Sequence, residues 1–126
     1  MAKSARASTR FGTPAYAPID PVDETSARPD FAMLVYPAYL DDKKGGVTPE
    51  LDLAAPVPPT LIVHTGDDKS FIAGSKAYAA ALATAKRPHR FLLYPTGGHG
   101  YGRHCQGDAK IWPDEAARWL GEIGVR

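Results

Sequence analysis

The chain has 126 residues, with 15 lysines and arginines against 14 aspartates and glutamates, for a formal net charge of +1. This length suits one domain, residues 1–126, and the near-zero charge gives no reason to expect a nucleic-acid partner. No apolar run reaches the roughly 20 residues that span a bilayer, so no membrane contact is expected. The N-terminal residues lack the apolar segment of a signal peptide. Cys105 is the one cysteine, which excludes an internal disulfide. We expect a cytoplasmic location by default, and a secreted one if the chain belongs to a longer protein with its own signal.

The first part of the chain divides into a proline-rich segment and a predicted sheet. Residues 1–30 form the N-terminal segment and residues 31–126 the expected α/β core, because four prolines break up the start of the chain: Pro14, Pro18, Pro21 and Pro29. Residues 31–36 form a continuous apolar run, typical of a strand buried on both faces of a parallel sheet. Residues 41–58 are polar and rich in glycine and proline, which indicates a long connection. Residues 61–64 are the second predicted strand.

The second part alternates predicted helices with a strand. Small and apolar residues recur every three or four positions over residues 74–85, which predicts an amphipathic helix ended by Pro88. Residues 91–94 predict a third strand, and residues 108–123 a second helix with an apolar side. This order indicates an α/β fold of about three parallel strands joined by crossover helices. Ligands of such sheets bind beyond the carboxyl ends of the strands.

Two of the predicted strands lead into turns that carry reactive side chains. Thr65-Gly66-Asp67-Asp68 follows the second strand, and Gly97-Gly98-His99-Gly100 follows the third. A carboxylate that orients a histidine is the Asp-His part of a Ser-His-Asp triad. The glycines around His99 leave space at the imidazole, which favours a catalytic base. Either Asp68 or Asp67 can be the acid. Neighbouring side chains on a turn point in different directions, so one of them is expected to form the turn instead.

Other polar side chains favour structural roles. We expect His64 to be packed and hydrogen-bonded to the backbone, and His89 to lie on the surface. Ser75 is expected to cap the helix that it opens, and Ser70 to cap the same helix or to face solvent. None of the five serines sits in the Gly-x-Ser-x-Gly context that a nucleophile requires: Ser4, Ser8, Ser26, Ser70 and Ser75.

The remaining candidates give no metal or cofactor site. His99, His104 and Cys105 do not match the ligand spacing of a zinc site. Cys105 lies in no context that would activate a thiolate as a nucleophile. The glycine-rich turn lacks the Lys-Ser/Thr of a phosphate loop. We therefore expect no metal and no cofactor.

These motifs together resemble a known enzyme family. The segment from Pro58 through His64 to Asp68, followed by Ser75 and Tyr78, and the segment from Tyr94 through His99 to Gly102 are similar to the C-terminal half of α/β-hydrolase esterases. The most similar group is the acetyl-xylan esterase and prolyl-oligopeptidase-like branch. The resemblance covers essentially residues 8–121. It implies a partial α/β-hydrolase fold and a carboxylic-ester hydrolase, with acylated carbohydrates as possible substrates.

The resemblance also implies roles for individual residues. It makes Asp68 the acid and His99 the base, with four aromatic residues bordering an acyl or sugar pocket: Tyr36, Tyr39, Phe71 and Tyr101. The family's serine elbow and oxyanion hole would precede residue 1, so the chain resembles an esterase that begins part-way through, as a truncated enzyme would.

The missing segment leaves three functional hypotheses. The chain is an ester hydrolase without its serine, a catalytically inactive fragment or self-associating module, or one part of a triad that another chain completes. The strand at residues 31–36 would lie mid-sheet in a complete enzyme. Here it would be an open apolar edge, so we expect two chains to pair along it or the N-terminal segment to cover it.

Overall fold

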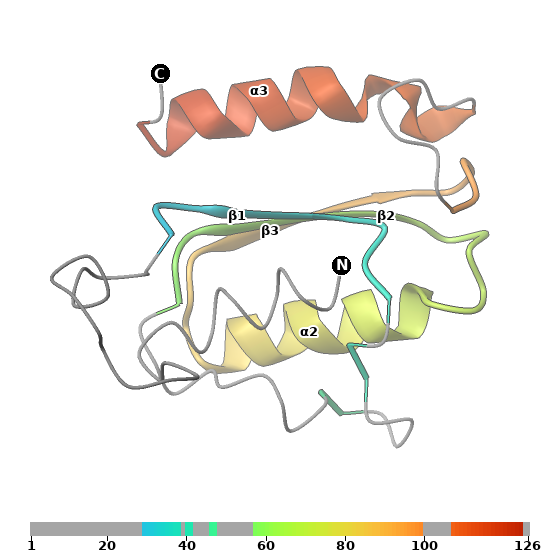
Figure 1. The fold of residues 1–126 in the computed structure, drawn as a ribbon, viewed down its shortest axis with the longest axis horizontal. Helices are drawn as coiled ribbons and strands as arrows, with labels where there is room; N and C mark the ends of the chain where they lie inside the picture. Colours follow the sequence, from blue (N-terminus) through green and yellow to red (C-terminus); the bar gives the residue numbers. More distant parts are fainter. Residues whose placement is uncertain (1–28, 39, 42–45, 48–56, 100–106, 125–126) are drawn as a thin grey trace, which may run out of the picture.

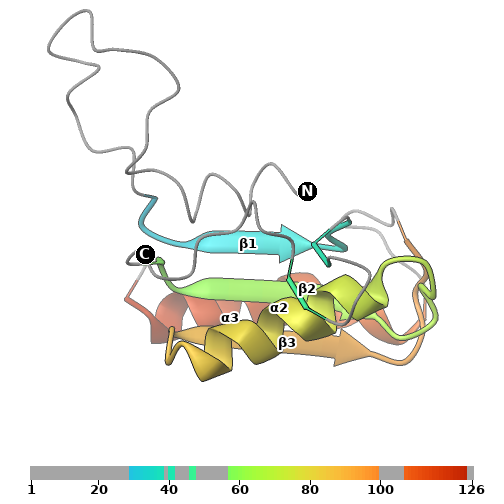
Figure 2. The same ribbon diagram turned by 90° about the horizontal axis from the view of Figure 1, so that it is seen from below.

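The structure is a computed structural model that describes residues 29–38, 40, 41, 46, 47, 57–99 and 107–124. Its centre is a sheet of three parallel strands in the order β1-β2-β3: β1 (Ala32–Val35), β2 (Thr60–Thr65) and β3 (His89–Tyr94). Figure 2 shows the three strands side by side and running in the same direction. The predicted α/β fold with three parallel strands is confirmed. The second and third strands are longer than predicted, and the first is shorter.

Helices cover both faces of this sheet. Helix α2 (Ile72–Thr84) connects β2 to β3 and lies on one face, while α3 (Trp112–Glu122) lies on the other (Figure 1). Within the described residues, no helix is long and apolar enough to cross a membrane. The predicted helix at 74–85 begins two residues earlier than expected. The predicted helix at 108–123 is two elements, a 3-10 turn η1 (Asp108–Ile111) followed by α3. Pro113 in the first turn of α3 suits this boundary, because a proline lacks the N–H that would continue a preceding helix.

The side chains of β2 point alternately to the two faces of the sheet, and two separate hydrophobic cores lie on these faces. All six residues of β2 are buried. Ile62 faces α2 and packs in a cluster with Tyr78 and Leu82, while Leu61 and Val63 face α3 and pack in another cluster with three residues of α3: Trp112, Ala116 and Trp119. Successive side chains of a strand point to opposite faces, so His64 shares the α2 side with Ile62. This alternation decides which side chains meet at the end of the strand.

A glycine allows a neighbouring segment to approach α2 closely. Gly74 lies in the first turns of α2, where an added Cβ would come within 3.3 Å of both the Leu40 Cβ and the Asp41 nitrogen. The segment at Leu40, which is fully buried, can therefore rest directly on the helix. Asp41 also forms an isolated antiparallel bridge with Val47, so part of the predicted 41–58 connection folds back on itself.

The side chain of Tyr78 places a polar hydroxyl group in the core. Its side chain is fully buried, and its hydroxyl has no hydrogen-bond partner among the described residues. Burial raises the pKa of Tyr78 to about 12. A buried polar group without a partner loses its hydration and gains nothing in return.

We predict that Tyr78→Phe leaves the free energy of unfolding unchanged or raises it by up to about 1 kcal/mol, because the ring stays packed and a hydroxyl without a partner among the described residues is removed. Urea denaturation measures the difference. Leu82→Ala, in the same cluster, is the control and should lower the stability by about 2–5 kcal/mol. A loss of more than about 1 kcal/mol in Tyr78→Phe would show that the hydroxyl is satisfied.

Candidate active site

The carboxyl ends of β2 and β3 bring the two predicted reactive turns together. In the parallel register Thr65 pairs with Tyr94, so both strands end at the same level. The N–H of Gly66 donates to the carbonyl of Tyr94 at 2.7 Å, which ties the turn after β2 to the end of β3. The side chains of Asp68 and His99 therefore start from neighbouring points on one edge of the sheet.

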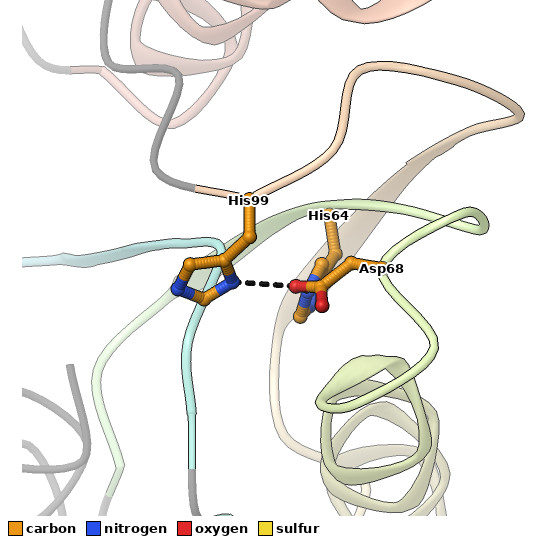
Figure 3. A group of neighbouring side chains, drawn as sticks. All are labelled: His64, Asp68 and His99. Atoms are coloured by element: carbon orange, nitrogen blue, oxygen red, sulfur yellow. Dashed lines mark hydrogen bonds and ion pairs between the residues drawn. The ribbon is translucent and has the colours of Figure 1, made fainter.

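Asp68 and His99 are joined by a short hydrogen bond. The Nδ1–H of His99 donates to Oδ2 of Asp68 at 2.5 Å, as Figure 3 shows. A carboxylate only accepts, so the proton of this bond belongs to the imidazole. The other ring nitrogen, Nε2, points away from Asp68 in Figure 3. The side chain of Asp68 is 6% exposed, whereas that of His99 is 37% exposed. The buried partner can thus orient an imidazole that solvent or a substrate can reach.

Asp67 holds the loop that carries His99. Its Oδ1 accepts from the N–H of Gly98 at 2.9 Å and its Oδ2 from the N–H of Gly97 at 3.1 Å. These hydrogen bonds, that from Gly98 first, hold the pKa of Asp67 below its ordinary value. Asp67 and Asp68 therefore point to different partners, as predicted. The partner of Asp67, however, is the backbone of the His99 loop and not its own turn.

The loop has further attachments on both of its sides. The hydroxyl of Thr65 donates to the carbonyl of Gly98 at 2.5 Å. Gly98 has a φ of 74°, a conformation that favours glycine. On the other side, the N–H of Asp108 donates to Oγ1 of Thr96 at 3.1 Å, and the hydroxyl of Thr96 donates to Oδ2 of Asp108 at 3.0 Å. The turn that presents His99 is thus fixed to the end of β2 and to the start of η1.

His64 and Ser75 differ from the sequence-based expectation. His64 is fully buried, and its Nε2–H donates to the same Oδ2 of Asp68 at 2.6 Å. Its Nδ1 lies 2.6 Å from Oγ of Ser75. The prediction that His64 bonds to the backbone is therefore wrong. The predicted cap at Ser75 is wrong too, because α2 begins after Phe71 without any side-chain cap. Ser70 is exposed, which is the second of the two roles predicted for it.

The sequence contained a signal for this contact. Ile62 and His64 share one face of β2 by strand alternation, while Ser75, Tyr78 and Leu82 share one face of α2 by helix spacing. Those two faces pack against each other. The contact is not predictable from the strand end by itself, because it depends on α2 packing over that face of β2.

The charge states in this cluster follow from burial and hydrogen bonding. Burial acts to raise the pKa of Asp68, but the hydrogen bonds from His64 and His99 outweigh it and hold this pKa below its ordinary value. Burial lowers the pKa of His64 below 6.5, although the neighbouring Asp68 carboxylate acts in the opposite direction. The buried pair is therefore a carboxylate with a neutral imidazole.

Aromatic rings surround the imidazole of His99. The rings of Tyr36 and Phe71 each lie 5.0 Å from it between centroids. Tyr36 has a φ of 40°, a strained conformation for a bulky residue, directly after β1. Two of the four predicted pocket residues therefore contact His99. The other two, Tyr39 and Tyr101, lie outside the described residues, and their role stays a prediction.

One carboxylate and two imidazoles at this site are side chains of the kinds that bind metal ions. The ligand atoms of His64, Asp68 and His99 lie within 4.8 Å of one another. Both imidazoles, however, contact one carboxylate oxygen at hydrogen-bond distance. A metal at its usual distance of about 2.0–2.2 Å would have to separate these atoms. The observed geometry is that of a hydrogen-bonded network. His104 and Cys105 lie outside the described residues.

Comparison with solved structures places this geometry in a known fold. An acetyl ester-xyloside bifunctional hydrolase from Caldicellulosiruptor lactoaceticus is 27% identical, with a TM-score of 0.77, and the match covers 95% of this chain and 52% of that one. The strand order, the helices on both faces and the match to this enzyme decide the fold class. The chain has a partial α/β-hydrolase fold. It spans about half the length of the solved hydrolases that it matches.

Two further α/β hydrolases support the same fold. The carboxylesterase Cest-2923 from Lactobacillus plantarum is 24% identical, with a TM-score of 0.61, and the match covers 79% of this chain and 46% of that one. Esterase 2 from Thermogutta terrifontis is 17% identical, with a TM-score of 0.65 and coverages of 87% and 48%. No protein-family model and no curated protein sequence matches the chain. These two neighbours therefore support the partial α/β-hydrolase fold.

We predict that the amide signals of Gly97 and Gly98 titrate with a midpoint below 3.8, the ordinary value for an aspartate, because both N–H groups favour the ionised form of Asp67. The stabilisation from this carboxylate is complete above the ordinary value. It is lost as the pH falls through the lower value of the folded protein. Two-dimensional ¹H–¹⁵N spectra recorded from neutral pH downward measure it.

Asp67→Asn is the matched control, because it keeps a similar shape without a titrating group. In this variant the titration at the two glycines should disappear. A midpoint above 3.8 in the unaltered chain would contradict the assignment of Asp67 as the anchor of the loop.

Proposed function

We propose that this chain provides the acid and the base of a carboxylic-ester hydrolase. The observation that carries the proposal is the hydrogen bond from Nδ1 of His99 to the buried carboxylate of Asp68. This bond leaves Nε2 of His99 with a lone pair, which is the state that a general base needs. The match to solved esterases supports the same reaction class.

In the proposed reaction His99 moves protons and Asp68 stabilises the charge that results. Nε2 takes the proton of an attacking serine hydroxyl while the serine oxygen bonds to the ester carbon. The imidazolium formed is stabilised by Asp68 and then gives its proton to the departing alkoxide. Water attacks the acyl-serine in the same way: its proton passes to Nε2 and then to the serine oxygen, which releases the acid.

The proposed serine comes from outside the described part of the chain. Ser75 is fully buried and bonded to His64, and Ser70 lies exposed on the turn after β2. In the family that the sequence resembles, a Gly-x-Ser-x-Gly elbow supplies the nucleophile. We propose that a segment with this motif, in a longer form of the protein or in another chain, completes the triad. Without it, the Asp-His pair can activate only water, and slow hydrolysis of labile esters is the most that is expected.

Acylated carbohydrates are the proposed substrate class. One solved structural neighbour is named as an acetyl ester-xyloside bifunctional hydrolase. The rings of Tyr36 and Phe71 at His99 suit an apolar acyl group or the face of a sugar ring. Tyr39 and Tyr101 are proposed to extend the same pocket.

A second candidate function is a non-catalytic module that associates with itself through β1. Among the described residues, β1 pairs with β2 alone. The N–H of Ala32 donates to the carbonyl of Pro59, directly before β2, and the N–H of Tyr36 donates to the carbonyl of Val63 in β2. By alternation the N–H of Val35 points away from β2. An outward row of backbone groups is a template for pairing with another chain.

We predict that the purified chain hydrolyses p-nitrophenyl acetate slowly and that His99→Ala lowers this rate at least about 100-fold, because the general base is lost. Release of p-nitrophenol at neutral pH measures the rate. His89→Ala is the control, because His89 bonds to the carbonyl of Arg87, away from the site. Equal rates in all three proteins, or no hydrolysis in any, would favour the non-catalytic module.

For the second candidate, we predict that the chain sediments as a dimer at high concentration and that Val35→Pro sediments as a monomer. The substitution removes an outward N–H and leaves the bonds of β1 to β2 in place. Analytical ultracentrifugation measures the mass, and circular dichroism confirms the fold. A strictly monomeric unaltered chain would exclude pairing along β1.

A further inference from the structure

We propose that Ser75 and His64 are positioning residues that hold the Asp68 carboxylate in place for His99. In this network the hydroxyl of Ser75 donates to Nδ1 of His64, and both His64 Nε2–H and His99 Nδ1–H donate to one oxygen of Asp68. The proposal deepens the proposed ester hydrolysis and rests on it for its catalytic consequence. The proton arrangement itself can be measured without any activity.

The proton positions follow from the chemistry of the three groups. The carboxylate of Asp68 can only accept, so His64 must carry a proton on Nε2. His64 is fully buried, and burial favours its neutral form. A neutral imidazole with a proton on Nε2 has a lone pair on Nδ1. The group 2.6 Å from that lone pair, Oγ of Ser75, must then be the donor.

The hydroxyl of Ser75 bonds to His64 and not to the backbone of its own helix. A serine inside a helix often donates to the carbonyl four residues earlier. Thr84 of the same helix does so, with its hydroxyl 3.0 Å from the carbonyl of Ala80. Among the described residues, the hydroxyl of Ser75 bonds to His64 alone, and α2 needs no cap from it. The one proton of the Ser75 hydroxyl is therefore available to select the tautomer of His64.

The hydrogen bond from Ser75 to His64 affects His99 through the carboxylate of Asp68. Two donors to one oxygen fix the rotation of the carboxylate, and they stabilise its ionised form against burial. If Ser75 no longer donates, Nδ1 of His64 becomes a competing site for the ring proton. Each His64 that carries its proton there presents a lone pair to Asp68, which repels the carboxylate. Asp68 then loses one of its two donors and becomes free to turn away from His99.

The test is nitrogen NMR on the full 126-residue chain with ¹⁵N-labelled histidine, because long-range ¹H–¹⁵N correlations show which ring nitrogen carries the proton. We expect His64 to be a single Nε2–H tautomer in the unaltered chain, and a mixture with the Nδ1–H tautomer in Ser75→Ala. The pKa of Asp68, followed by its carboxyl ¹³C signal, should rise in Ser75→Ala. Ser75→Thr keeps the hydroxyl and should restore both properties. Ser70→Ala, an exposed serine beside the same helix, is the control and should change neither.

The outcomes separate this proposal from the proposed function. A proton on Nδ1 of His64 in the unaltered chain, or an unchanged tautomer in Ser75→Ala, would overturn the network. If Ser75→Ala does not fold, Ser75→Cys retains a weaker donor and should give an intermediate tautomer ratio, whereas a ratio equal to that of the unaltered chain would also overturn it. Where the chain hydrolyses p-nitrophenyl acetate, Ser75→Ala should lower kcat about tenfold and leave KM unchanged. An inactive chain with the predicted tautomers supports the network and counts against the proposed function alone.

Discussion

A single buried carboxylate oxygen, Oδ2 of Asp68, accepts hydrogen bonds from two imidazoles, and the rest of the site is arranged around that oxygen. One donor, His64, belongs to the buried end of β2, and the other, His99, to a partly exposed loop after β3. Removing a carboxylate from water favours its protonated form, which could not stabilise an imidazolium. The two donors counter that tendency. They keep the carboxylate ionised under a packed layer of side chains.

The sheet supplies the geometry that this interaction requires. Because β2 and β3 are parallel and in register, their following turns leave the sheet at the same level, and one segment from His64 to Ser75 makes strand end, turn and helix. Asp67 uses the same turn to hold the backbone of the His99 loop. Two adjacent aspartates therefore perform separate tasks: one positions a loop, and the other binds the side chain that the loop presents. The carboxyl ends of these two parallel strands therefore bring Asp68 and His99 together.

Much of this arrangement could be predicted from the sequence. The apolar run at 61–64 and the glycines around His99 are local signals, and they predict the strand, the turns and the pairing of an aspartate with His99. The resemblance to α/β-hydrolase esterases then selects Asp68. Strand limits were less predictable: Tyr36 leaves β1 through a strained backbone that no apolar pattern reveals. His64 is buried as predicted, but its partners and the role of Ser75 were not predictable, because their contact depends on α2 packing over one face of β2. A strand-end histidine has no local feature that distinguishes a backbone partner from a buried side-chain partner.

The central claim, that one oxygen of Asp68 accepts from two imidazoles, is tested most directly by the low-field ¹H spectrum of the chain. Strong hydrogen bonds to a carboxylate shift imidazole N–H protons far downfield and slow their exchange. We predict two such resonances at neutral pH. Both should be lost in Asp68→Asn, and one of them should remain in His64→Gln. A spectrum with no such resonance, or with resonances that persist in Asp68→Asn, would contradict the shared carboxylate.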